Sequence, residues 1–327
     1  MLHITRRHLF AGAAAVGAAA ALPIGGQTAN AATPAAKGTG VYRYKFGDVE
    51  VVQLMDGART FPVPDHFVAD VSKDEAIKAA AAAYMPDGKV TIPFTPTLVN
   101  TGSKLILIDT GNGQAAHAAS KGVVGQMTMN MLAAGFDPKQ IDIVIITHGH
   151  LDHINGLKDA DGKPVFPNAE LKIPAAEYAY WTNDANAEKA NPYNKGVFAA
   201  VKKGLDGLKF TQYEGGKEVA PGLTSVSTPG HTPGHMSFVL ASGSKRMLIQ
   251  ADVTNIPSLF LRYPDWAIMF DNDGKQAAET RHKFYDMAAA EKLLVSGYHF
   301  PYPCVGYVEK DGAKNYRLVP VAWDPNG

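Results

Sequence analysis

Apolar positions along this chain follow two periods, one typical of strands and one typical of helices. The apolar stretch 141–146 has the composition of a buried strand, whereas the alanine-rich segments 74–84 and 275–291 have helical spacing. Other strands are expected at 41–56 (a hairpin turning at Gly47-Asp48), 97–100, 105–109, 223–227, 236–240, 247–250, 293–296 and 305–321. Other helical segments are expected at 125–134 and 175–203. This alternation predicts an α/β fold rather than a helical bundle or a pure β-sandwich.

Composition fits an ordinary folded protein. The chain has 327 residues, of which 46% are hydrophobic and 19% are charged. A chain of this length can bury one large core or two small ones. It has neither the charge excess of a disordered chain nor the basic excess of a nucleic-acid binder. Cys304 is the single cysteine, so an internal disulfide is excluded and stability is expected from packing or bound metal.

The beginning of the sequence has the pattern of an export signal. Paired arginines in T-R-R-H-L-F precede an alanine-rich apolar stretch and an A-N-A cleavage pattern. This predicts a twin-arginine-type signal over 1–31, a spacer over 32–40 and one folded domain over 41–327, in the periplasm or secreted. A Sec-type signal is the alternative, and a membrane anchor is disfavoured because the apolar stretch is about 14 residues where a span needs about 20.

Removal of 1–31 would change the charge balance slightly. It takes two of the 31 basic residues and none of the 31 acidic ones, which leaves a net charge of −2. The sequence therefore gives no reason to expect nucleic acid or an anionic membrane as a partner.

The stretch I-T-H-G-H-L-D-H, which ends at His153, places three histidines and an aspartate directly after the strand 141–146. In an extended chain, side chains two positions apart point the same way, so His148 and His150 can bind one ion. Asp152 and His153, at the turn into the next helix, can bind a second ion close by. The alternative is an ordinary polar loop at a strand end.

Four ligands do not complete two ions, and further candidates follow other strands. His231, Asp252 and His299 each come just after a strand-like run. Side chains at such positions can converge at one edge of a sheet. A lone histidine is more often structural than a ligand. These three positions, taken together with the cluster at 148–153, nevertheless predict a dinuclear metal centre.

These motifs resemble those of the metallo-β-lactamase fold superfamily, and within it those of the exported methyl parathion hydrolase and aryl-lactonase group. The shared features are D-T-G from Asp109, H-x-H-x-D-H over 148–153, T-P-G-H-T-P-G-H over 228–235, A-D-V-T around Asp252 and Y-H-F-P-Y-P around His299. The resemblance implies a metallo-β-lactamase-type αββα sandwich with two divalent metal ions, zinc expected and manganese, cobalt or iron as alternatives. One ion would take His148, His150 and His231, and the other Asp152, His153 and His299, with Asp252 bridging.

The activity implied by the resemblance is metal-dependent hydrolysis. A hydroxide that bridges the two ions would attack the substrate, with Asp252 and Asp152 as the carboxylates of the catalytic site. Asp109 matches a position that supports the metal ligands, and a turn or cap aspartate is its alternative.

One departure from the family bears on the substrate. Acyl-homoserine lactonases of the superfamily carry a tyrosine shortly after the bridging aspartate, whereas Thr254-Asn255-Ile256 follows here. We therefore expect leaving groups that depart unassisted, as in aryl esters, aryl lactones and organophosphate triesters.

Several alternatives stay open at this point. The chain could be an acyl-homoserine lactonase that quenches quorum sensing, a β-lactamase, a thioesterase, an iron-dependent redox member of the superfamily or a metal-binding protein without activity. The expected partner is a small lactone, ester or phosphotriester, and a homodimer is left open. Four aromatic residues are candidates for the pocket wall, with core packing as the alternative: Trp181, Phe198, Phe260 and Phe67. His235 is either a support for the ligands or purely structural.

Overall fold

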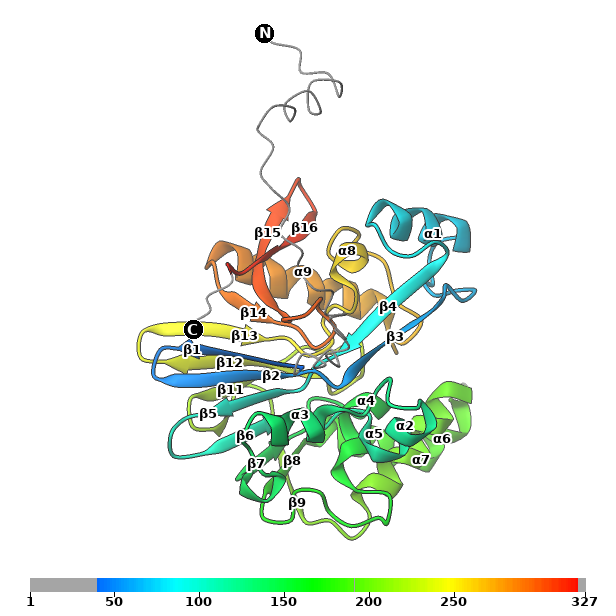
Figure 1. Cartoon of the computed structure of the whole chain (residues 1–327). Helices are drawn as coiled ribbons and strands as arrows, with labels where there is room; N and C mark the ends of the chain where they lie inside the picture. The colour runs from blue at the N-terminus through cyan, green and yellow to red at the C-terminus, as the bar shows by residue number, and fades with distance from the viewer. Residues whose placement is uncertain (1–39, 191, 323–327) are drawn as a thin grey trace, which may run out of the picture. The chain divides into compact units, whose positions relative to one another are not determined.

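Two mixed β-sheets of seven strands each form the framework of the described residues, 40–190 and 192–322, in this computed structural model (Figure 1). The first sheet contains β1 (Val41–Phe46), β2 (Val49–Leu54), β5 (Thr97–Asn100), β6 (Leu105–Ile108), β7 (Ile143–Ile145), β8 (Glu170–Pro174) and β9 (Phe210–Tyr213), in that spatial order. The second contains, also in spatial order, β10 (Glu218–Ala220), β11 (Leu223–Ser227), β12 (Met236–Ser242), β13 (Lys245–Ile249), β14 (Leu294–Ser296), β15 (Val305–Asp311) and β16 (Asn315–Pro320).

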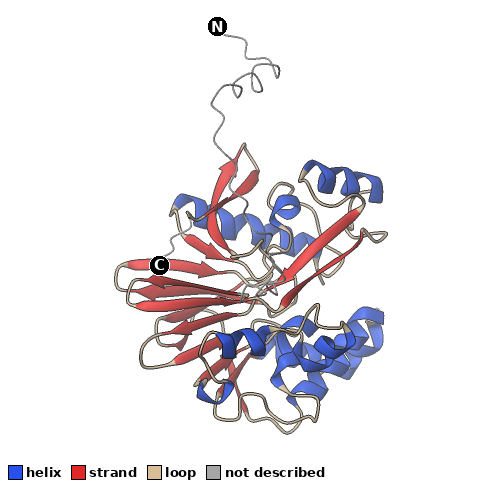
Figure 2. Ribbon diagram, in the orientation of Figure 1, coloured by secondary structure: helices blue, strands red, loops and turns tan. Residues whose placement is uncertain are grey.

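The helices lie outside the pair of sheets (Figure 2). They are α1 (Lys73–Ala82), α2 (Gly113–Ala119), α3 (Met127–Ala133), α4 (Leu151–Ile154), α5 (Ala175–Trp181), α6 (Asp184–Lys189), α7 (Pro192–Leu205), α8 (Pro257–Phe260) and α9 (Gly274–Ala290), with 3₁₀ turns at Pro138–Gln140 and Asn155–Leu157. Among the described residues, none of the helices is both long and apolar enough to cross a membrane. The expected signal and all of the spacer except Gly40 lie outside the described residues.

The period-two pattern of the strands explains why the sheets are covered on both faces. In β6, Ile106 and Ile108 point into the core between the two sheets, whereas Leu107 points to the helices. In β7, Ile143 and Ile145 likewise enter the core between the sheets, and Val144 packs under the helices. Strands that are apolar on both faces need a cover on both faces.

Three buried clusters follow from this arrangement. One fills the space between the sheets, one lies between the first sheet and α3, α5 and α7, and one lies between the second sheet and α9. The αββα sandwich of the metallo-β-lactamase type, expected from the resemblance, is confirmed.

A separate hairpin was not predicted from the sequence. Strands β3 (Gly57–Pro62) and β4 (Lys89–Phe94) form a two-stranded antiparallel sheet of their own, which we call the β3–β4 hairpin although α1 lies between its strands in the sequence. Gly57 also forms a bridge to Val124. Together with α1 and α8, the two strands enclose a fourth buried cluster. The segment 175–203, expected to be helical throughout, divides into α5, α6 and most of α7, separated by short turns.

Candidate metal centre

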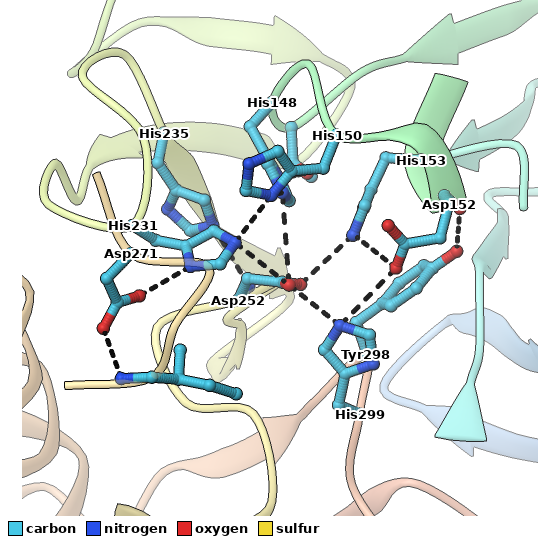
Figure 3. A network of polar contacts seen from close by, with 12 residues as sticks. His148, His150, Asp152, His153, His231, His235, Asp252, Asp271, Tyr298 and His299 are labelled. Atoms are coloured by element: carbon cyan, nitrogen blue, oxygen red, sulfur yellow. Dashed lines mark hydrogen bonds and ion pairs between the residues drawn. The ribbon is translucent and has the colours of Figure 1, made fainter. Parts of the chain in front are cut away.

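The seven predicted ligands meet at one edge of the sandwich (Figure 3). His148 and His150 follow the end of β7, and Asp152 and His153 lie in the four-residue helix α4 that comes next. The remaining ligands follow strands of the other sheet: His231 follows β11, Asp252 follows β13 and His299 follows β14. Because β13 and β14 are parallel neighbours, the residues that follow them lie side by side.

The donors fall into groups of the size that a metal ion needs. His148, His150 and His231 form one group and Asp152, His153 and His299 another, each with ligand atoms that all lie within 4.8 Å of one another. A third group within the same limit joins His148, His153 and Asp252.

The Asp252 carboxylate lies between the two main groups. Its oxygens are 3.4 Å from Nε2 of His231 and 3.4 Å from Nε2 of His153. They also lie 2.8 Å from Nε2 of His299. Figure 3 shows this carboxylate between the two groups, a position from which it can serve a cation in either group.

Unsatisfied polar atoms support metal binding at this place. Nε2 of His150, Nε2 of His153 and Oδ1 of Asp252 are buried and have no hydrogen-bond partner in the described part of the chain. A buried polar atom without a partner is costly, and a cation would satisfy Nε2 of His153 and Oδ1 of Asp252. His150 turns its other ring nitrogen, Nδ1, toward Nε2 of His148 and of His231, at 3.2 and 2.9 Å, so Nδ1 is the donor that it offers a cation. Imidazole and carboxylate donors suit zinc and its neighbours among the divalent transition metals. The residues present therefore fit two metal ions.

The hydrogen bonds of the imidazoles set which nitrogen is free. Nδ1 of His153 donates to Asp109 at 2.7 Å, Nδ1 of His299 donates to the Pro93 carbonyl, and Nδ1 of His148 lies 2.9 Å from Oγ1 of Thr147. Each of these contacts occupies Nδ1 and leaves Nε2 to face the centre.

Burial and neighbouring charges divide the ligands electrostatically. Burial and the adjacent imidazoles hold the pKa of His148 and His150 well below the usual value, so both are neutral and able to bind a cation. Burial opposes charge on His153 too, but the carboxylates of Asp152, Asp252 and Asp109 raise its pKa well above the usual value. Burial by itself raises the pKa of Asp152. The nearby His153 and His299 outweigh burial and lower this pKa to about 2.

Asp109 lies where the sequence interpretation placed it. Its carboxylate accepts from Nδ1 of His153, from the Thr147 amide at 2.8 Å and from the Thr147 hydroxyl at 2.9 Å. It therefore orients one ligand directly and holds the residue next to a second, His148.

Two further residues support the ligands. The sequence analysis did not identify Asp271, and it left the role of His235 open. Asp271 accepts from Nδ1 of His231 at 2.7 Å, and no motif around Asp271 indicates this. Nε2 of His235 accepts a hydrogen bond from the Asp252 amide at 3.0 Å. Burial lowers the pKa of His235 to about 3, so its imidazole is neutral. His235 thus supports the loop of a ligand without reaching the centre itself.

A cleft of ≈ 620 Å³ opens above the ligands. Phe61, Ile92 and Phe94 of the β3–β4 hairpin form one wall, and Tyr193 and Phe270 are also part of the lining. Polar residues complete the lining, among them Arg59, Asn112, Ser120, Asn155 and Asn255. The cleft therefore suits a substrate with a polar reacting group and an apolar remainder.

The four aromatic residues expected in the pocket wall do not line this cleft. Trp181 and Phe198 are buried between the first sheet and its helices, where Trp181 donates to Glu177. Phe67 and Phe260 are buried behind the hairpin. The prediction was wrong because these residues belong to helices or to segments packed under the hairpin, whereas the wall comes from strands that were not recognised.

Comparison with known proteins agrees with the fold and the centre. A family model described as the metallo-beta-lactamase superfamily matches residues 95–299. The chain belongs to this superfamily. Its sequence is 29% identical over 188 residues to an N-acyl homoserine lactonase of a Bacillus species, which covers 52% of this chain and 68% of that protein.

Solved structures of the superfamily extend the likeness over most of the chain. The hydrolase AbOPH superposes with a TM-score of 0.80 at 27% identity, covering 88% of this chain and 99% of that one. AidC, described as a dizinc quorum-quenching lactonase, superposes with a TM-score of 0.78 at 27% identity, covering 87% of this chain and 98% of that one. This superfamily member is thus a metallo-hydrolase with lactonases among its similar proteins.

Proposed function

We propose that the protein is a dinuclear metal-dependent hydrolase of lactones, with acyl-homoserine lactones as the main substrate class. The observation that carries this is the convergence of seven donors, six of them buried and Asp152 half-buried, at the floor of a cleft with an apolar wall. The names of AidC and of the Bacillus relatives support the lactone class. Acyl-homoserine lactones were the alternative at the level of sequence, and the comparisons favour them over aryl esters and phosphotriesters.

The ligand assignment is part of this proposal. One ion would be held by His148, His150 and His231, which we call the three-histidine half of the centre. The other would be held by Asp152, His153 and His299, which we call the mixed half, and Asp252 would serve both. When bound, two divalent ions supply an acidified water as nucleophile and polarise the bond to be cleaved.

The chain's own residues prepare the site for that chemistry. Asp152 and Asp252 stay ionised, since nearby imidazoles outweigh the effect of burial and hold the pKa of Asp252 well below its usual value. Asp109 and Asp271 fix the orientation of one imidazole in each half. The apolar wall of Phe61, Ile92 and Phe94 holds the acyl chain away from water.

The first experiment combines metal analysis with a substrate panel. Two ions per chain and turnover of acyl-homoserine lactones are expected. Asp252→Ala should lose turnover and both ions, whereas His299→Ala should lose turnover and the ion of the mixed half. His282→Ala is the control, because the half-buried His282 contacts Asp265 and Tyr316 rather than a ligand, so this variant should keep both ions. Full activity in Asp252→Ala after loss of metal would contradict the proposal. Iron content with no hydrolysis would favour a redox member instead.

Aryl esters, aryl lactones and phosphotriesters are the second candidate class. Phe61, Phe94, Tyr193 and Phe270 give the cleft an aromatic lining that suits such substrates. Unassisted leaving groups were expected because no tyrosine follows Asp252. Tyr193 of α7, however, lines the cleft beside His150 and brings a phenolic hydroxyl to it. The expectation of unassisted leaving groups is tested by plotting rate against leaving-group pKa: a steep dependence supports it, and a flat one rejects it.

Export is a separate proposal that depends on residues 1–31 alone. Fusion of that segment to a reporter should give transport that requires the paired arginines. Transport that survives their replacement by lysine would point to the Sec route.

A further inference from the structure

A buried carboxylate outside the ligand set joins the two loops that carry the three-histidine half. Glu177 lies on α5 and is only 1% exposed. Its Oε2 accepts the Gly149 amide at 2.8 Å, and its Oε1 accepts the Gly234 amide at 2.7 Å. Oε2 also accepts Nε1 of Trp181 at 2.7 Å.

The two glycines mark the ligand loops. Gly149 stands between His148 and His150, and Gly234 stands three residues after His231. Each oxygen of one carboxylate therefore binds a different loop, one that follows β7 of the first sheet and one that follows β11 of the second. Because a carboxylate is rigid and planar, it fixes the separation of the two amides.

Close approach explains why both positions are glycine. A Cβ on Gly149 would lie 2.5 Å from Cδ1 of Trp181, and a Cβ on Gly234 would lie 2.4 Å from the Glu177 amide nitrogen. Contacts of that length are not tolerated, so both loops are seated against α5 as closely as the backbone allows.

The mixed half is held by other groups. His153 is oriented by Asp109, and His299 is oriented by the Pro93 carbonyl. Neither contact involves Glu177. Glu177 thus supports the three-histidine half and not the mixed half, whereas the two halves share Asp252, and Asp109 also holds Thr147, next to His148.

We propose that Glu177 is a positioning residue that assembles the three-histidine half of the metal centre by clamping its two loops to α5. This inference rests on the dinuclear assignment of the proposed function but not on its substrate. Glu177 touches backbone amides rather than imidazoles, so it acts on His148, His150 and His231 through their loops.

The test is metal affinity in Glu177→Gln. The glutamine side chain keeps the size of glutamate but replaces one acceptor oxygen with an NH₂ group, so one loop loses its hydrogen bond. Metal-free protein is titrated with Zn²⁺ against a chromophoric chelator, which yields two stepwise dissociation constants. We expect affinity in the three-histidine half to fall about 10- to 100-fold, the range found when outer contacts of metal ligands are removed, with the mixed half unchanged.

Background variants assign each constant to its half. His299→Ala removes a ligand of the mixed half, and there the added Glu177→Gln change should weaken the remaining ion. His231→Ala removes a ligand of the three-histidine half, and there the added change should have no effect. Equal weakening of both halves, or of neither, would overturn the inference.

A matched control separates positioning from general stability. Asp56 is also a carboxylate that is 1% exposed, and it accepts from the amides of Gly125 and Met127 and from Asn112, away from the ligand loops. Asp56→Asn should lower the melting temperature while leaving the metal affinity of the three-histidine half unchanged. If Glu177→Gln does not fold, Gly234→Ala pushes the same loop from α5 and should give the same selective weakening.

The two proposals fail in different ways. A silent substrate panel with selective weakening in Glu177→Gln would reject the lactone proposal and keep the clamp. Lactone turnover with unchanged metal affinities in both Glu177→Gln and Gly234→Ala would reject the clamp and keep the lactone proposal.

Discussion

Two aspartates that bind no ion in our assignment each hold one imidazole. Asp109 accepts from Nδ1 of His153, and Asp271 accepts from Nδ1 of His231, both at 2.7 Å. A charged acceptor on the far nitrogen fixes the ring and makes it a better donor to a cation. The pair therefore offers one support for each half of the centre, on side chains of the same type.

Asparagine at these two positions should weaken opposite halves most, because Asp109 reaches the three-histidine half only through Thr147. In Asp109→Asn the mixed half should lose about 10- to 100-fold in metal affinity, and in Asp271→Asn the three-histidine half should lose a similar factor. The measurement is the same chelator competition on metal-free protein. Each variant is the control for the other, so loss at both halves in both variants would show that the supports are not separable.

Cys304 should be inert in the folded protein. Burial raises the pKa of its thiol to about 12. In the unfolded chain the thiol ionises near pH 9, so this group adds stability below about pH 9 and that contribution is lost as the pH rises from there toward 12. Alkylation by iodoacetamide at pH 8 should proceed only after denaturant is added. Rapid labelling of the native protein would mean that the thiol is exposed.

The ligands could be predicted from the sequence because most of them lie in short motifs after apolar strands. His148, His150, Asp152 and His153 lie within six consecutive positions, so their proximity needs no tertiary structure. The contacts of Asp271 and Glu177 could not be predicted, because each joins segments 28 or more residues apart and no recognisable motif surrounds either carboxylate.

At the level of elements, the β3–β4 hairpin decides the shape of the cleft. Its face toward the ligands carries Phe61, Ile92 and Phe94, and Phe94 contacts His299 edge to face with ring centres 5.5 Å apart. The sequence did not reveal it, since its strands, GARTFP and KVTIPF, mix glycine, proline and charged residues into the apolar alternation. By contrast, β6 and β7 are almost purely apolar and were predicted to within one to three residues.

Two phenylalanine variants separate the cleft wall from the core. Phe94→Ala should raise KM most for lactones with long acyl chains, because it removes apolar surface that the chain covers. Phe198→Ala should cost about 3–5 kcal/mol of folding stability and leave the chain-length preference unchanged, since Phe198 is buried under the first sheet. Steady-state kinetics over a series of acyl lengths, with thermal unfolding of both variants, checks this. A changed preference in Phe198→Ala would contradict it.

At the level of the whole molecule, the metal centre should contribute to stability as well as to chemistry. Ligand atoms without hydrogen-bond partners are buried where the two sheets meet, so their cost falls on the folded state until ions bind. An ion that binds only the folded state, at a free concentration about a thousand times its Kd, adds about 4 kcal/mol to the free energy of unfolding.

Removal of the ions by a chelator should therefore lower the melting temperature, and added Zn²⁺ should restore it. The His299→Ala variant, with one ligand fewer, should show a smaller difference between the metal-loaded and metal-free forms. Calorimetry of both proteins in both states provides the measurement. Equal melting temperatures with and without ions would mean that the donors are stable unpaired.

Each sheet is made from one continuous part of the sequence, β1 to β9 (with the separate β3–β4 hairpin) and then β10 to β16. His148, His150, Asp152 and His153 come from the first part, whereas His231, Asp252 and His299 come from the second. A chain cut at the turn between β9 and β10 would leave each fragment with its own sheet but with an incomplete set of donors. Binding of metal at the full centre would then require that the two fragments associate, so metal uptake can be used to measure fragment complementation.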